Sequence, residues 1–264
     1  MTAPAGHDPW LVLRRFTQAR IALGRAGVSM PTRAWLEFSL AHAKAKDAVH
    51  LPLEREKIAS QLSAAGFAHL LLHSEALDRS SYLRRPDLGR KLDQASRELL
   101  QQFKSPIQYD IVFVIADGLS SCGIAAHAVM LLQEVVCRLP GRRLAPVVVA
   151  EQSRVALGDE IGEILHAEQV VMLIGERPGL SSPDSIGIYL TYAPHVGRND
   201  AERNCISNVR PEGLSFALAA HRLAYLLDAA KRLKLSGINL KDESDLLLSA
   251  ASTGNVRHCP EKVT

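Results

Sequence analysis

Apolar side chains in the first hundred residues recur at the spacing of α-helices. From Trp10 to Phe103 no run of β-branched residues interrupts this pattern. Side chains three or four positions apart line one face of a helix, so we predict helices over residues 31–49, 54–65 and 87–103. The first of these helices is expected to bury four apolar side chains, namely Trp35, Leu36, Phe38 and Leu40.

The pattern changes at Lys104-Ser105-Pro106. Beyond this point, short and nearly continuous runs of Val, Ile and Leu alternate with longer helical segments. The predicted strands are residues 110–117, 146–151, 169–176 and 186–192, and the predicted helices are residues 124–139, 158–166 and 211–235. Such strands between helices are typical of a mostly parallel sheet that is covered on both faces.

The change of pattern predicts an α/β protein in two parts. We expect a helical N-terminal domain at residues 1–104. It is followed by a three-layer α/β (Rossmann-like) domain with a mostly parallel sheet at residues 105–264, including a loose tail after Asp242.

Composition and charge narrow the class of protein. Of the 264 residues 47% are hydrophobic and 22% are charged, which is enough apolar surface for a core and excludes a disordered chain. The net charge of +3 is too small to indicate nucleic-acid binding. The first 33 residues nevertheless oppose one acid, Asp8, with five arginines: Arg14, Arg15, Arg20, Arg25 and Arg33. This segment either docks onto an acidic partner or forms an ordinary solvated face.

The sequence favours a protein of the reducing cytoplasm. No apolar stretch follows a basic N-terminal segment, so we expect no secretory signal. The longest uncharged stretch, residues 118–133, is too short and too polar for a membrane span. The four cysteines, Cys122, Cys137, Cys205 and Cys259, are far apart in the sequence. This spacing fits free thiols better than a disulfide framework or a zinc site.

Ligands of an open parallel sheet bind at the carboxyl ends of its strands. Three predicted loops lie there: residues 117–123, 153–155 and 175–180. None carries a dinucleotide or nucleoside-triphosphate fingerprint, and Ser120 and Ser121 lack the G-x-S-x-G elbow of hydrolases. Cys205 could be a nucleophile, but no general base is indicated for it.

A metal site is not indicated either. His69 and His73 are four residues apart, as two ligands on one helix face would be. However, they lack the Glu of H-E-x-x-H, and no third ligand is evident. The residues alone therefore predict an α/β binding domain without a catalytic constellation of its own.

Seven motifs show a more specific relationship. Over residues 16–241 the chain resembles the family of ethanolamine ammonia-lyase small (light) subunits. The motifs that carry the resemblance are Ala19-RIALGRAG-Val28, Ala41-HAKAKDAVH-Leu51, Tyr82-LRRPDLGR-Lys91, Asp117-GLS-Ser121, Gly175-ERPGL-Ser181, Asp200-AERNCISNVR-Pro211 and Ser236-GINLK-Asp242.

This resemblance implies a role in an adenosylcobalamin-dependent lyase that converts ethanolamine to acetaldehyde and ammonia. The large subunit would hold the substrate, and this chain would form the other wall of the cobalamin site within a hetero-oligomer. The family's cofactor contacts correspond to Val155, Glu176 and Cys205, and no catalytic residue is implied in this chain. Leu119 stands where the cobalt-ligating His of the Asp-x-His-x-x-Gly motif would be, so the resemblance implies no metal ligand here.

Two other functions stay open at this point. The chain could be a non-catalytic scaffold that stabilises the large subunit, or a stand-alone α/β enzyme with a nucleotide cofactor. Relatives packaged in bacterial microcompartments often carry an extra N-terminal segment, whereas nine residues precede Trp10 here. A free complex in the cytoplasm and a packaged one are therefore both expected possibilities.

Overall fold

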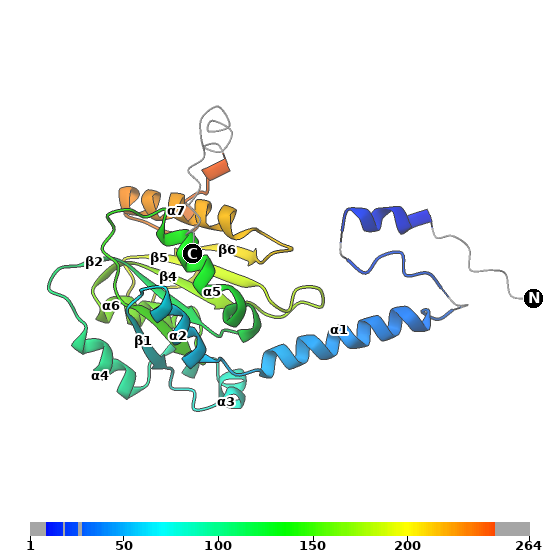
Figure 1. Cartoon of the computed structure of the whole chain (residues 1–264), viewed down its shortest axis with the longest axis horizontal. Helices are drawn as coiled ribbons and strands as arrows, with labels where there is room; N and C mark the ends of the chain where they lie inside the picture. The colour runs from blue at the N-terminus through cyan, green and yellow to red at the C-terminus, as the bar shows by residue number, and fades with distance from the viewer. Residues whose placement is uncertain (1–8, 18, 26–27, 246–264) are drawn as a thin grey trace, which may run out of the picture.

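The computed structural model describes residues 9–17, 19–25 and 28–245 (Figure 1). A six-stranded sheet forms its centre, in the order β1-β3-β2-β4-β5-β6. The strands are β1 (His69–His73), β2 (Tyr109–Ala116), β3 (Val147–Glu151), β4 (Ala167–Gly175), β5 (Ile186–Tyr192) and β6 (Arg203–Val209). The strands β1, β3, β2 and β4 are parallel, whereas β5 and β6 extend the sheet in antiparallel pairing.

Helices cover both faces of this sheet. One face packs against α2 (Arg55–Ala64), α5 (Ser121–Val136) and α7 (Phe216–Leu233), and the other against α4 (Gln94–Gln102) and α6 (Leu157–Ile164). Successive residues of a strand point to opposite faces, so β2 serves both layers. Its Ile111, Phe113 and Ile115 join the first core, while Val112 and Val114 join the second. The predicted fold class, three-layer α/β with a mostly parallel sheet, is confirmed.

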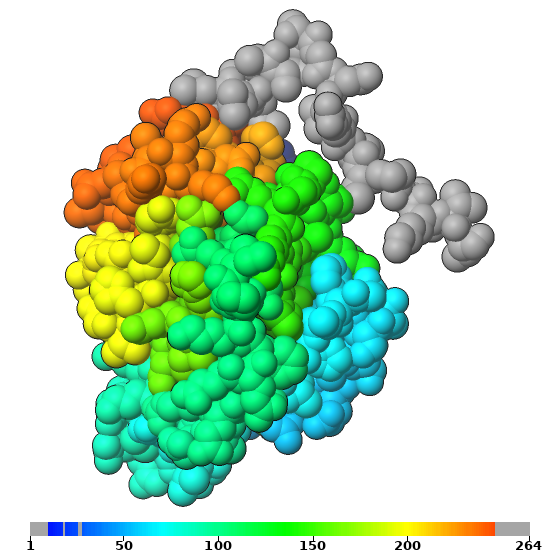
Figure 2. All heavy atoms as spheres, turned by 90° about the vertical axis from the view of Figure 1, so that its left-hand side faces the viewer, coloured from blue at the N-terminus to red at the C-terminus, as the bar shows by residue number. Residues whose placement is uncertain are grey.

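The remaining elements lie around this body. They are α1 (Thr32–His50), α3 (Arg79–Arg84) and four 3₁₀ turns, at Pro9–Arg15, Leu88–Arg90, Asp200–Glu202 and Gly237–Asn239. Helix α1 extends away from the sheet and carries the N-terminal segment with it (Figure 1). Figure 2 faces the left-hand side of Figure 1, with the residues of α7 at the top. No helix of the described residues is both long and apolar enough to cross a membrane.

Most predicted elements are present with small shifts at their ends. The four predicted strands are β2, β3, β4 and β5, and the predicted helices correspond to α1, α2, α5, α6 and α7. The helix expected over residues 87–103 is a 3₁₀ turn followed by α4, because Asp93 caps α4 by accepting a hydrogen bond from the Ser96 amide at 2.7 Å. The tail expected to be loose lies, beyond residue 245, outside the described residues.

The helical interpretation of residues 10–103 is wrong at residues 69–73. This segment is β1, which pairs with β3 at the edge of the sheet. Three leucines between two histidines fit either a helix or a strand, and pairing with the valines of β3 selects the strand. A strand rises ~3.3 Å per residue, so His69 and His73 lie about 13 Å apart along it, too far to share a metal ion. The division of the chain at residues 104 and 105 stays a prediction, since β1 completes the sheet from the N-terminal side of that point.

The burial expected on α1 is also wrong. Trp35, Leu36 and Leu40 are 56%, 61% and 58% exposed, and Phe38 is only partly buried. The helix has its predicted apolar residues, but the described chain supplies no surface to cover most of them.

A buried ion pair joins the antiparallel edge of the sheet to α6. The Arg203 guanidinium on β6 donates two hydrogen bonds of 2.6 Å to the Asp159 carboxylate, and both side chains are only 2% exposed. Arg203 also donates to the Thr191 hydroxyl on β5 at 2.9 Å. The pair therefore fixes β5 and β6 against a helix of the parallel part of the sheet.

Removing one member of this pair should destabilise the fold. We expect Asp159→Asn to lower the free energy of unfolding by about 3–5 kcal/mol, because Arg203 would keep a buried and uncompensated charge. Urea unfolding of the isolated chain measures this loss. Asp200→Asn is the control, since Asp200 also contacts Arg203 but is 93% exposed, and it should leave the midpoint unchanged. Equal midpoints for Asp159→Asn and the parent chain would contradict the structural importance of the pair.

Candidate functional site

An open cavity of about 800 Å³ lies at the carboxyl ends of the parallel strands. All three loops expected at this edge contribute to it, and β5, β6 and the N-terminal segment complete its wall. Its lining residues are Thr17, Ala19, Tyr82, Gly118, Leu119, Arg154, Val155, Ile174, Gly175, Glu176, Arg177, Ser181, Ser182, Ser185, Tyr189, Ser207, Asn208 and Arg210. Cavities that hold organic ligands commonly measure roughly 300–1,000 Å³, so this one is of suitable size.

Close backbone contact between two of the loops forms the floor of the cavity. A Cβ atom on Gly175 would lie 1.7 Å from the Ser120 carbonyl oxygen, and one on Gly118 would lie 2.2 Å from the Gly175 carbonyl oxygen. Gly118 also has a φ of +54°, which favours glycine. The Leu119 amide donates to the Gly175 carbonyl at 2.9 Å. Both glycines are therefore needed to bring the ends of β2 and β4 together.

The two serines of the first loop have structural roles. The Ser120 hydroxyl donates to the Pro183 carbonyl at 2.8 Å, and the Ser121 hydroxyl donates to the Leu51 carbonyl at 3.0 Å. Both residues are buried. They tie the start of α5 to the segment before β5 and to the end of α1.

A buried carboxylate fixes the loop after β3 by accepting hydrogen bonds from its backbone. Asp117, directly after β2, accepts hydrogen bonds from the Gln152 and Ser153 amides, each at 2.9 Å. Arg79 of α3 donates to the same carboxylate at 3.1 Å. Burial raises the pKa of Asp117 to about 6, although these donors oppose the shift. Asp117 does not line the cavity; the residues it holds are followed by Arg154 and Val155, which do.

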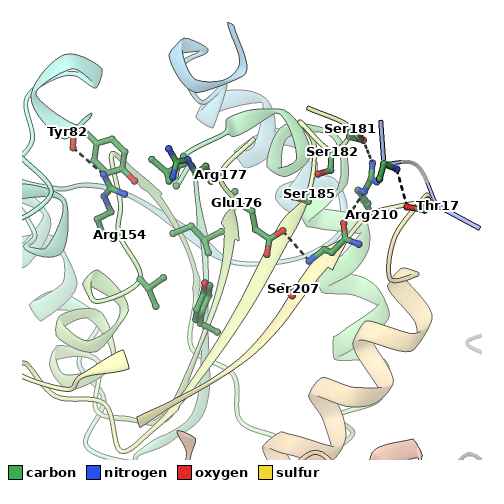
Figure 3. A pocket seen from close by; sticks show the side chains of 18 residues that line it. Thr17, Tyr82, Arg154, Glu176, Arg177, Ser181, Ser182, Ser185, Ser207 and Arg210 are labelled. Carbon is green, nitrogen blue, oxygen red and sulfur yellow. Dashed lines mark hydrogen bonds between the residues drawn. The ribbon is translucent and has the colours of Figure 1, made fainter. Parts of the chain in front are cut away.

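An aromatic ring between two arginines forms one side of the cavity. Tyr82 lies 4.9 Å from the Arg79 guanidinium carbon and 4.3 Å from that of Arg154, measured to the ring centroid. Its hydroxyl donates to the Ser153 carbonyl at 3.0 Å, and burial raises its pKa. Figure 3 shows Tyr82 and Arg154 on one side of the cavity, Arg210 and Ser181 on the other, and Glu176 between them.

Glu176 lies at the end of β4, at the centre of the cavity wall. Its Oε2 accepts a hydrogen bond from the Asn208 amide at 3.1 Å, which links the loop after β4 to the end of β6. Within the described chain it forms no ion pair with Arg154 or Arg177. It is also the one carboxylate among the described lining residues, where it faces three arginines, Arg154, Arg177 and Arg210.

The other two predicted site residues differ in their position. Val155 lines the cavity beside Arg154. Cys205 is exposed on β6 and pairs in register with Tyr189 of β5, which does line the cavity. Reduced solvation raises the pKa of the Cys205 thiol, so the reactive thiolate is disfavoured. The structure thus brings Val155 and Glu176 into one cavity and places Cys205 beside it.

The arginine-rich N-terminal segment reaches the rim of the cavity. Arg20 donates to the Leu180 carbonyl at 3.2 Å and to the Ser181 hydroxyl at 3.4 Å. On the same rim Arg210 donates to the Ser181 carbonyl at 3.1 Å. Arg14 folds back on its own segment, where it donates to the Ile21 and Ala22 carbonyls. Of the five arginines expected either to dock onto a partner or to form a solvated face, Arg20 therefore fixes this segment to the loop after β4 and Arg14 stabilises the segment itself.

The sequence interpretation missed Tyr82 and Arg210 as parts of the site, and it placed Asp117 in a strand-end loop without assigning it a role. Tyr82 lies in the part of the chain that was predicted to be a separate helical domain. It was therefore not expected at the edge of the sheet. Asp117 and Arg210 both stand in motifs noted for the resemblance, but their contacts join residues more than 25 positions apart. Only the chain path could show those contacts.

The donor and acceptor set fits a large ligand that is rich in amides and hydroxyls. Serine hydroxyls and arginines donate hydrogen bonds, while Glu176 and backbone carbonyls accept them. The Nε atom of Arg154 is buried and has no hydrogen-bond partner in the part of the chain that is described. This atom belongs to the guanidinium that stacks on the Tyr82 ring. Across residues 9–17, 19–25 and 28–245, no three His, Cys, Asp or Glu side chains gather as metal ligands would.

Comparison with known proteins gives one consistent result. The family model "Ethanolamine ammonia-lyase light chain (EutC)" matches residues 7–241. An ethanolamine ammonia-lyase small subunit of Pseudomonas fluorescens (strain Pf0-1) is 55% identical over 251 residues, which cover 94% of this chain and 92% of that protein. A small subunit of Ralstonia nicotianae is 54% identical over 257 residues, covering 96% and 95% of the two chains. One from Pseudomonas aeruginosa (strain UCBPP-PA14) is 54% identical over 258 residues, covering 95% and 94%.

Proposed function

The chain belongs to the ethanolamine ammonia-lyase light chain family, and from this premise we propose that it forms one wall of an adenosylcobalamin site. The convergence of all three strand-end loops on one open cavity carries the proposal. Val155 and Glu176 line that cavity and Cys205 lies beside it, at the positions that the family resemblance implies for cofactor contacts.

The cavity has the chemistry that a corrin ring requires. Cobalamin presents primary amides around its rim, and each amide both donates and accepts hydrogen bonds. Ser181, Ser182 and Arg154 can donate to the amide oxygens, and Glu176 can accept from an amide nitrogen. The cavity is open on one side, so a second protein surface would close the site over the bound ring. When bound, adenosylcobalamin supplies the radical chemistry of the lyase reaction.

The second surface is, in this proposal, the large subunit of the lyase, which would also hold the substrate. The apolar residues of α1 support a docking role, because a partner surface would cover them. Trp35, Leu36 and Leu40 are more than half exposed, as are Trp10 and Phe16 in the segment before α1. The same segment carries Arg14, Arg15, Arg20 and Arg25.

The place of the complex in the cell is inferred from its cysteines. Cys122 and Cys205 are free thiols in the described chain, which suits the reducing cytoplasm. We propose a cytoplasmic complex, either free or inside a bacterial microcompartment.

The division of labour between the subunits is tested by reconstitution. We expect the isolated chain to produce no acetaldehyde from ethanolamine and adenosylcobalamin, because the lining residues offer binding groups and no substrate-activating pair. Mixed with a large subunit, it should form a complex that shows the absorption spectrum of bound cobalamin. Lyase activity of the isolated chain would contradict the proposal, as would an assembled complex that retains no cobalamin.

Glu176 separates a cofactor contact from a scaffold role. Glu176→Gln keeps an oxygen for the Asn208 amide but removes the charge, and a hydrogen bond to a charged acceptor is stronger than one to a neutral acceptor. We expect the affinity of the assembled complex for cobalamin to fall about tenfold, or 1.4 kcal/mol. The thermal stability of the cofactor-free chain should change little.

Glu163→Gln is the matched control for this variant. Glu163 also accepts a backbone hydrogen bond, from the Val196 amide at 2.8 Å, but on α6 and outside the cavity lining. It should leave cobalamin affinity unchanged. Lost stability with unchanged affinity in Glu176→Gln would show instead that Glu176 only holds β6, as the scaffold function would have it.

The docking role of α1 is tested by a double substitution on one helix face. Leu36 and Leu40 are four residues apart, so Leu36→Ser with Leu40→Ser removes neighbouring apolar side chains. We expect less large subunit to co-purify with the variant, while the melting temperature of the isolated chain stays within error. Leu233→Ser on α7, where Leu233 is 51% exposed, should leave the yield of complex unchanged. Equal yields for both variants would exclude α1 as the docking surface.

A further inference from the structure

The turn after β3 has a backbone conformation that its sequence does not favour. Gln152 has a φ of +54°, in the left-handed region that side chains other than glycine rarely occupy. Such a residue persists only where its surroundings hold it in place. Gln152 and Ser153 are both buried, so their amides also need hydrogen-bond acceptors.

Asp117 supplies both acceptors from a different strand. Its Oδ2 takes the Gln152 amide and its Oδ1 takes the Ser153 amide, each at 2.9 Å. The next two residues, Arg154 and Val155, line the cavity. The carboxylate therefore acts on the cavity wall through the turn that it holds.

The network around Asp117 extends to the other member of that wall, Tyr82. Arg79 donates to Asp117 at 3.1 Å and to the Gly118 carbonyl at 2.9 Å, and its guanidinium lies over the Tyr82 ring. Tyr82 in turn donates to the Ser153 carbonyl at 3.0 Å, so Ser153 is held through both its amide and its carbonyl.

We propose that Asp117 is a positioning residue for the cofactor, whose ionised carboxylate fixes the Gln152–Ser153 turn and thereby the place of Arg154 and Val155 in the cavity. This inference rests on the proposed cobalamin site. The carboxylate has about four acceptor positions, and the Arg79 guanidinium and the amides of Gln152, Ser153 and Gly118 act on them, so a proton taken up by Asp117 competes with one of these donors. Because donors do not pair with donors, neutralising Asp117 weakens the set of hydrogen bonds that holds the turn.

Protonation of Asp117 falls in an accessible pH range. Burial raises its pKa to about 6, while Arg79 and the amides favour the charged form. The charged and titratable groups around it are Arg79 and Tyr82 on α3, with Arg154 beyond the tyrosine ring; Gly118 and Gly175 bring only backbone to this point.

The protonation of Asp117 affects stability and cofactor affinity in opposite directions, so a positioning role can be distinguished from unfolding. The pKa of Asp117 is higher in the folded chain than its ordinary value of 3.8, so its contribution to stability is fully present below pH 3.8 and is lost as the pH rises through about 6. Acidification from pH 7 to pH 5 therefore favours the folded chain at this group. If only the ionised form holds the turn correctly, cofactor affinity changes in the opposite direction and falls about tenfold over the same range.

The test uses the complex with the large subunit and cyanocobalamin as the probe, titrated by absorbance between pH 5 and pH 7.5. We expect the parent complex to bind about tenfold more weakly at pH 5 than at pH 7. Asp117→Asn should bind weakly at pH 7 and lose most of this pH dependence, because its amide donates where two donors already point. Asp110→Asn is the matched control: Asp110 lies at the other end of β2 and also accepts a backbone hydrogen bond, from Arg143 at 2.8 Å, so this variant should keep the parent profile.

Two outcomes would overturn the inference. One is an Asp117→Asn complex with the affinity and pH profile of the parent; the other is a parent complex whose affinity does not change over this range. A parent complex that binds no cyanocobalamin at any pH would instead contradict the proposed function.

A second measurement needs neither a variant nor the cofactor. Hydrogen exchange of the peptide that contains residues 152–155, in the parent complex and corrected for the intrinsic effect of pH, should show protection falling between pH 7 and pH 5. Constant protection would overturn the role of Asp117 even if Asp117→Asn fails to fold.

Discussion

A buried carboxylate at the end of the central strand organises the edge of the sheet where the cavity lies. Asp117 is 2% exposed, and its charge is compensated by one arginine and two backbone amides rather than by water. Removing a charge from water costs several kcal/mol, so each of these partners must remain in place. The requirement fixes α3, the loop after β3 and the start of α5 relative to one another. The wall formed by Tyr82, Arg154 and Val155 follows from it.

The opposite wall depends on the absence of side chains. Gly118 and Gly175 let the loops after β2 and β4 touch, and this contact sets Glu176 at the lip of the sheet. From there Glu176 reaches the Asn208 amide and draws the end of β6 to the cavity. Two strands of antiparallel pairing thus extend a parallel sheet and give its ligand edge a third side. The Arg203–Asp159 pair secures that extension from below.

The chain consists of a sheet covered by helices and an exposed arm, which is α1 with the segment before it. This division suits a subunit of a larger assembly. The cores on both sheet faces are closed by the chain itself, whereas α1 presents apolar residues that nothing in the described chain covers. Arg20 connects the two parts, because it lies before α1 and binds the loop after β4 at the cavity rim. A partner that binds the arm would therefore also lie near the proposed cofactor site.

The sequence by itself determined the class of fold and the edge at which a ligand would bind. Long runs of Val and Ile between amphipathic segments are typical of a parallel sheet that is covered on both faces. The chain direction then places the carboxyl ends of these strands, where ligands bind, at one edge of the sheet. For that reason the loops at residues 153–155 and 175–180 could be placed at the ligand edge, whereas Val155 and Glu176 within them were implied by the family resemblance. The motifs then indicated the family, which local patterns of hydrophobicity do not encode.

Only the tertiary structure decided the rest. The three leucines of residues 69–73 fit a helix or a strand equally well, and the choice was made by pairing with β3, 78 positions away along the chain. Trp35 and Leu36 have the pattern of a buried face, but burial depends on a second surface that the rest of the chain does not supply. The roles of Asp117, Tyr82 and Arg210 depend on contacts between segments that are distant in the sequence. Hydrophobic period is a local property of the chain, whereas a charge, a ring or a strand edge finds its partner only when the whole chain has folded.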